Sequence, residues 1–82
     1  MKKILFIGNK NIISSELRRQ RKLCGLSQSQ LAAKMQTMGV NIDQQMISKI
    51  EKNTRLVTDY ELACLCDILH ISADQMLHPE GK

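Results

Sequence analysis

The stretch SQSQLAAKMQTMGVNIDQQMISKIE, residues 27–51, decides the fold, because it contains two helical patterns separated by a single turn. Ser27 is a good N-cap for the first helix, and Gly39 ends that helix. Its apolar residues recur at helical spacing: Leu31, Ala32, Met35 and Met38. After a connection over residues 40–42, Asp43 caps the second helix. The stretch therefore predicts two short helices joined by a loop.

The second of these helices has a narrow apolar face, which consists of Ile47 and Ile50. Its outer face is polar and consists of Asp43, Gln44, Gln45, Ser48 and Lys49. A glutamine amide matches adenine in bidentate geometry, and the N-terminal residues of a recognition helix are the ones that reach base edges. From the residues alone, two interpretations stay open: Gln44 and Gln45 read DNA bases, or they are solvated residues of a first helical turn.

Helical patterns continue on both sides of this stretch. Before it, a helix that Ser14 or Ser15 caps carries one stripe, Ile13, Leu17, Arg21 and Cys24, and Gly25 ends it. After it, Thr58 and Glu61 form a capping box for a fourth helix. The buried stripe of that helix is Leu62, Leu65, Cys66 and Leu69. Ser72 then caps a short fifth helix with Met76 and Leu77, and Pro79 prevents its continuation.

The length of 82 residues predicts one domain, over residues 11–78, with an arm over residues 1–10 and a tail over residues 79–82. Ile4-Leu5-Phe6-Ile7 precedes the turn signal Gly8-Asn9 and predicts a short strand or an ordered arm. This run is too short for a secretory or a membrane-spanning segment. We therefore expect a cytoplasmic protein that does not contact a membrane.

Composition narrows the classes of partner and of chemistry. Lys and Arg number 12 against 8 Asp and Glu, and the resulting charge of +4 suits a polyanionic partner. Aromatic residues make up 2%, which argues against base stacking on single strands or RNA. Cys24, Cys64 and Cys66 lack metal-ligand spacing and are expected to be reduced thiols that pack as small apolar groups. We find no nucleophile–base pairing and no phosphate-loop glycines, so we expect no enzyme activity, no metal and no cofactor.

The motifs LSQSQLA at residues 26–32 and ISKIE at residues 47–51 resemble the Cro/phage-repressor-type helix-turn-helix family, also called the XRE family. The resemblance covers residues 11–78. It implies an all-α fold, a compact bundle of five short helices of the lambda-repressor-like kind. It also implies DNA binding and transcription regulation.

The sequence departs from the family pattern at three places. Between Met35 and Ile47 the chain is about five residues longer than usual, so the second helix is extended, the turn is looped, or both. This leaves the approach of the third helix to DNA open. Asn53 replaces a usual glycine, and its side chain tolerates the left-handed backbone. His70 replaces a common helix-ending glycine at some cost in strain.

The resemblance also implies roles for single residues. Gln28 would hydrogen-bond a phosphate, and Lys52, Asn53 and Arg55 would touch the DNA backbone. The residues that would face base edges are Gln44, Gln45, Ser48 and Lys49. Arg21 and Glu51 would form an internal, partly buried ion pair between the first and third helices.

Together these expectations predict a protein that binds double-stranded DNA sequence-specifically. It would act as a repressor, as a homodimer on an inverted repeat. Candidate dimer surfaces are the fifth helix around Met76 and Leu77, and the arm Ile4–Ile7. The alternative is an antitoxin or another autoregulator that binds a protein partner through the same arm.

Overall fold

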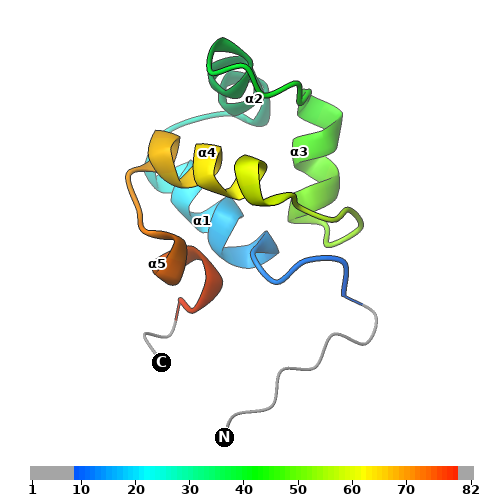
Figure 1. The fold of residues 1–82 in the computed structure, drawn as a ribbon, viewed down its shortest axis with the longest axis vertical. Helices are drawn as coiled ribbons and strands as arrows, with labels where there is room; N and C mark the ends of the chain where they lie inside the picture. The colour runs from blue at the N-terminus through cyan, green and yellow to red at the C-terminus, as the bar shows by residue number, and fades with distance from the viewer. Residues whose placement is uncertain (1–8, 80–82) are drawn as a thin grey trace, which may run out of the picture.

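Helices account for all the regular secondary structure in residues 9–79, the part of the chain that the computed structural model describes. Their bounds are α1 Ser14–Leu23, α2 Gln28–Thr37, α3 Gln44–Glu51, α4 Asp59–Leu69 and α5 Ala73–Leu77 (Figure 1). This part of the chain contains no strand, and the all-α prediction with five short helices is confirmed.

Four of the five helices begin at a side-chain cap. Ser27, Asp43, Thr58 and Ser72 each accept a hydrogen bond from a backbone N–H in the first turn, as the sequence predicts. The prediction of a serine cap for α1 was wrong, because the N-cap position is Ile13 and no side chain caps it. Instead, Asn11 Oδ1 accepts a hydrogen bond from the Ile13 N–H at 3.1 Å.

Left-handed residues end the first four helices. Positive φ angles are found at Gly25, Gly39, Asn53 and His70, one after each of these helices. After each of these four residues, the next backbone N–H donates to the carbonyl five residues back; the pairs are Leu26 to Arg21, Val40 to Met35, Thr54 to Lys49 and Ile71 to Cys66. The expected left-handed role of Asn53 is thus confirmed, with φ of 61°.

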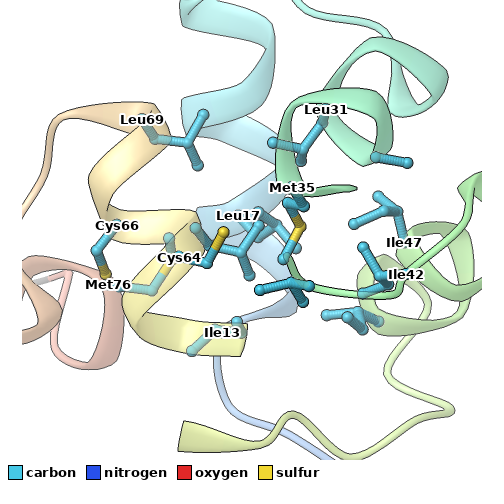
Figure 2. Packing of buried hydrophobic residues seen from close by; sticks show 14 residues of the cluster. Ile13, Leu17, Leu31, Met35, Ile42, Ile47, Cys64, Cys66, Leu69 and Met76 are labelled. Atoms are coloured by element: carbon cyan, nitrogen blue, oxygen red, sulfur yellow. The ribbon is translucent and has the colours of Figure 1, made fainter. Parts of the chain in front are cut away.

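One hydrophobic core lies between the helices. α2 packs against α3 and α4, α1 packs against α3, and α4 packs against α5. In Figure 2, side chains from α1, α2 and α4, namely Leu17, Met35 and Cys64, point toward one another. The largest fully buried side chains are Leu17, Leu31, Met35, Ile42, Ile47, Ile50, Leu65 and Met76.

The long connection between α2 and α3 is part of this core. Val40 and Ile42 are buried, and Gln36 Nε2 donates to the carbonyl of Ile42 at 2.7 Å. The added length is therefore divided between a second helix that runs to Thr37 and a loop held in place by two apolar residues. Because the end of α2 and the loop after it are both held in place, the start of α3 has a defined position relative to α2.

Two residues of the predicted apolar stripes are exposed instead. Met38 follows the last residue of α2 and is 49% exposed, although its Sδ lies 3.6 Å from the Sγ of the buried Cys64. Cys24 follows α1, is exposed, and has its Sγ 3.9 Å from the carbonyl oxygen of Leu69. Their neighbours in the stripes are buried, and so are Cys64 and Cys66.

The predicted arm Ile4–Ile7 and the residues after Pro79 lie outside the described residues, so the proposed domain bounds stay predictions. Within residues 9–79, no helix combines the length and the apolar character needed to cross a membrane.

Candidate nucleic-acid interface

One face of α3 packs on the core, and its polar face is exposed to solvent. Ile47 and Ile50 are fully buried. On the other side of the helix, Gln44, Gln45 and Lys49 are exposed and Ser48 is half-buried. The four residues expected to read bases therefore belong to one surface of a single short helix.

A hydrogen bond joins the first residues of α2 and α3. Gln44 Nε2 donates to Gln28 Oε1 at 2.9 Å, and Gln28 Nε2 donates to Glu51 Oε1 at 3.1 Å. These two bonds fix which way each amide faces. Gln44 retains its Oε1 and a second N–H for a ligand, which is the pair that recognises adenine. The sequence did not predict the Gln28–Gln44 contact, since it depends on how the two helix starts meet.

Arg21 and Glu51 form a bidentate ion pair between α1 and the end of α3. Arg21 Nε lies 2.6 Å from Glu51 Oε2, and Nη2 lies 3.0 Å from Oε1. Arg21 Nη1 also donates to the carbonyl of Leu26 at 2.8 Å. The side chains are 10% and 4% exposed, and the hydrogen bonds to Glu51 raise the pKa of Arg21. The pair connects α3 to the body of the domain.

Lys52 and Asn53 follow α3 and differ in how they are bonded. Lys52 is exposed, and its ammonium group has no hydrogen-bond or ion-pair partner among the described residues. Asn53 Oδ1 accepts from the backbone N–H groups of Lys10 and Asn11 at 2.8 and 3.0 Å, and its Nδ2 donates to Asn9. The Asn53 side chain thus holds the segment before α1 against the end of α3.

Arg55, expected at the DNA backbone, lies in a second bidentate ion pair. Its Nη1 and Nη2 donate to the two carboxylate oxygens of Glu61 at 2.9 and 3.0 Å, and Nη1 also donates to the carbonyl of Leu56. Glu61 is 4% exposed, and the hydrogen bonds from Arg55 lower its pKa. A phosphate at Arg55 would therefore compete with a buried carboxylate. The sequence marked Glu61 as a capping residue but gave no sign of this pairing.

Within the described residues, no three His, Cys, Asp or Glu side chains gather in a way that could hold a metal ion. The buried side-chain nitrogens and oxygens of these residues all have hydrogen-bond partners. Polar groups that are available to bind a ligand are thus found on the surface of this part of the chain, and several of them lie close together on α3.

Comparison with known proteins agrees with this geometry. A family model described as helix-turn-helix matches residues 17–76, which span most of α1 and extend into α5. No curated protein and no solved structure matched the chain. The matched family consists of DNA-binding transcription regulators with a lambda-repressor-like fold. The chain therefore belongs to the Cro/C1-type helix-turn-helix family, the XRE family.

Proposed function

We propose that this regulator reads a specific double-stranded DNA sequence and represses transcription in the cytoplasm, as a homodimer and without catalytic activity. The observation that carries the proposal is the position of α3. Its isoleucines are fully buried while Gln44, Gln45 and Lys49 are open to solvent. A helix held in this way can enter the major groove with its N-terminal residues at the base edges.

The open side chains of α3 suit specific bases. The amides of Gln44 and Gln45 match N7 and N6 of adenine, and the Lys49 ammonium matches O6 and N7 of guanine. The hydrogen bond to Gln28 positions Gln44 before DNA arrives, so less side-chain entropy is lost on binding. Ser48 lies between these residues and completes the base-contacting surface.

Gln28 and Lys52 flank α3 and are proposed as contacts to the DNA backbone. Gln28 is half-buried at the start of α2, and Lys52 is exposed just after α3. For Asn53 and Arg55 we propose that any backbone contact is made alongside their internal bonds. Their main contribution is then to hold the corner after α3 at the right distance from the phosphates.

A second copy of the chain is proposed to pack on the apolar surface that follows α3. Leu56 and Tyr60 are 69% and 60% exposed, and Leu56 lines a groove together with Ile12. Lys10 and Asp59 also line this groove, so a two-fold arrangement can place each charge against the opposite charge of the partner. On the fifth helix Met76 is fully buried, whereas Leu77 lines this groove and is proposed to take part in the dimer contact.

The dimer is tested by sedimentation of Leu56→Asp. Leu23→Asp is the matched control, because Leu23 is 68% exposed on α1 and lies outside the groove. We expect Leu56→Asp to dissociate the dimer and Leu23→Asp to leave it intact. A wild-type chain that sediments as a monomer on its inverted repeat would refute the dimer.

The repressor activity is tested by transcription from a promoter that overlaps the selected DNA site. Occupancy by the protein should reduce transcript in proportion to binding, since two proteins cannot fill one major groove. An increase in transcript on binding would identify an activator instead.

A further inference from the structure

A recess with a volume near 160 Å³ opens between α1, the start of α2 and the end of α3. Its lining residues are Arg18, Arg21, Gln28, Ser48, Glu51 and Lys52. Three helices thus contribute polar groups to one small hollow. The recess adjoins the proposed base-contacting surface, because Ser48 belongs to both.

The charges in this recess do not balance. The Glu51 carboxylate is occupied by Arg21 and Gln28. Arg18 and Lys52 are exposed, and neither has a hydrogen-bond or ion-pair partner among the described residues. The recess therefore carries two uncompensated positive charges, one on α1 and one after α3.

We propose that this recess takes one phosphate group of the DNA backbone, with Arg18 as the contact that the sequence did not single out. An arginine fork donates two parallel hydrogen bonds to phosphate oxygens, while a lysine acts as a point charge. Gln28, which the family resemblance already assigns to a phosphate, lines the same recess. The inference rests on the proposed DNA-binding function and assigns it a specific phosphate site.

A phosphate bound in this recess would connect α1 with the end of α3. Arg18 belongs to α1, whereas Lys52 directly follows α3. A phosphate held by both fixes the distance of α3 from the DNA backbone, independently of which bases lie in the groove. Arg18 is then a positioning residue, and its loss should weaken all sequences alike.

The test compares Arg18→Ala with Lys34→Ala by fluorescence anisotropy on a selected duplex between about 50 and about 200 mM salt. Lys34 is an exposed lysine on α2 that does not line the recess, so its variant controls for the loss of one charge. We expect Arg18→Ala to reduce the slope of log affinity against log salt by about 0.9 and to weaken binding about eightfold near 0.1 M salt. Arg18→Lys should keep the slope and bind with intermediate affinity, because charge remains and the fork is lost.

Equal effects of Arg18→Ala and Lys34→Ala would overturn the proposal. So would a change of preferred sequence in Arg18→Ala, since a phosphate contact carries no base information.

A second measurement does not depend on DNA. Titration with inorganic phosphate, followed by NMR at the Arg18 Nε–H, should give a saturable shift that chloride at equal ionic strength does not reproduce. If the wild type binds no duplex, the proposed function fails, and this titration still decides the recess. Absence of a saturable shift would then reject it.

Discussion

Arg21 on α1 meets Glu51, the last residue of α3, through two hydrogen bonds of 2.6 and 3.0 Å. Gln28 adds a third donor to the same carboxylate, and Gln44 bonds Gln28 in turn. Both the start and the end of α3 are thus connected to one buried ion pair. Such a pair adds little net stability over an apolar pair, but removal of one partner leaves the other charge buried.

Glu51→Ala should therefore lower both stability and DNA affinity. We expect a loss of about 3 kcal/mol in the free energy of unfolding, because Arg21 loses its partner while it is largely buried. Urea denaturation and DNA titration of the same variant measure the two effects. The double variant Arg21→Met with Glu51→Leu should recover most of the stability but not the DNA affinity, since Gln28 still lacks its acceptor. An unchanged melting temperature in Glu51→Ala would contradict the role assigned to this pair.

Gln45→Ala and Lys52→Ala should affect DNA binding in different ways. Loss of the Gln45 amide should relax the choice at one base pair by about 1–3 kcal/mol and leave the other positions unchanged. Loss of the Lys52 charge should weaken every duplex to a similar degree and reduce the salt slope. Competition binding with a set of single-substituted duplexes separates the two patterns. A uniform loss in Gln45→Ala would remove that residue from the base-reading set.

The left-handed residues Asn53 and His70 offer a matched comparison. Their φ angles are 61° and 58°, but only Asn53 uses its side chain for hydrogen bonds to described residues. His70→Gly should stabilise the domain by about 1 kcal/mol, because glycine relieves the backbone strain. Asn53→Gly should destabilise it, because the segment before α1 loses its acceptor. Thermal unfolding of both variants checks this, and equal shifts of the same sign would be inconsistent with it.

Acid should destabilise the fold through Glu16 and Glu61. Hydrogen bonds from Arg19 and from Arg55, respectively, hold the pKa of each carboxyl below its ordinary value of 4.5. A carboxyl with a lower pKa in the folded chain stabilises the fold above its unfolded pKa and loses this contribution as pH falls. Stability should thus be nearly constant from about pH 7 to about pH 5 and then decline.

The variant Glu61→Gln tests this pH dependence. It should be less stable than wild type near neutral pH and should show a smaller decline in acid, as followed by urea denaturation. Asp67→Asn removes an exposed carboxylate and should keep the wild-type profile. If Glu61→Gln retained the full acid decline, the lowered pKa of Glu61 would not be its cause.

Local signals in the sequence predicted the helices well. The caps at Ser27, Asp43 and Thr58 and the left-handed turn at Asn53 depend on residues close in the chain, and all are present. Contacts between distant segments were not predictable in this way. The Arg55–Glu61 pair depends on the path of the corner after α3, which side-chain type does not reveal.

The burial of the connection between α2 and α3 is a second feature that could not be predicted from the sequence. The sequence predicts only a connection at Val40-Asn41-Ile42, whereas in the structure both apolar residues are buried in the core. At the candidate site, the family pattern indicated Gln28 and the α3 residues, whereas Arg18 emerged only from the recess. A single arginine on an amphipathic helix carries no periodic signal that separates a ligand contact from a solvated charge.

Selection from a pool of random duplexes shows whether the chain reads a specific DNA sequence. The wild-type chain is mixed with the pool, bound duplexes are recovered and sequenced, and affinity for the selected sequence is measured at two salt concentrations. We predict enrichment of an inverted repeat whose half-sites lie about 34 Å apart, with affinity that falls steeply as salt rises. Recovery of duplexes with no common sequence, or affinity that does not change with salt, would contradict the account.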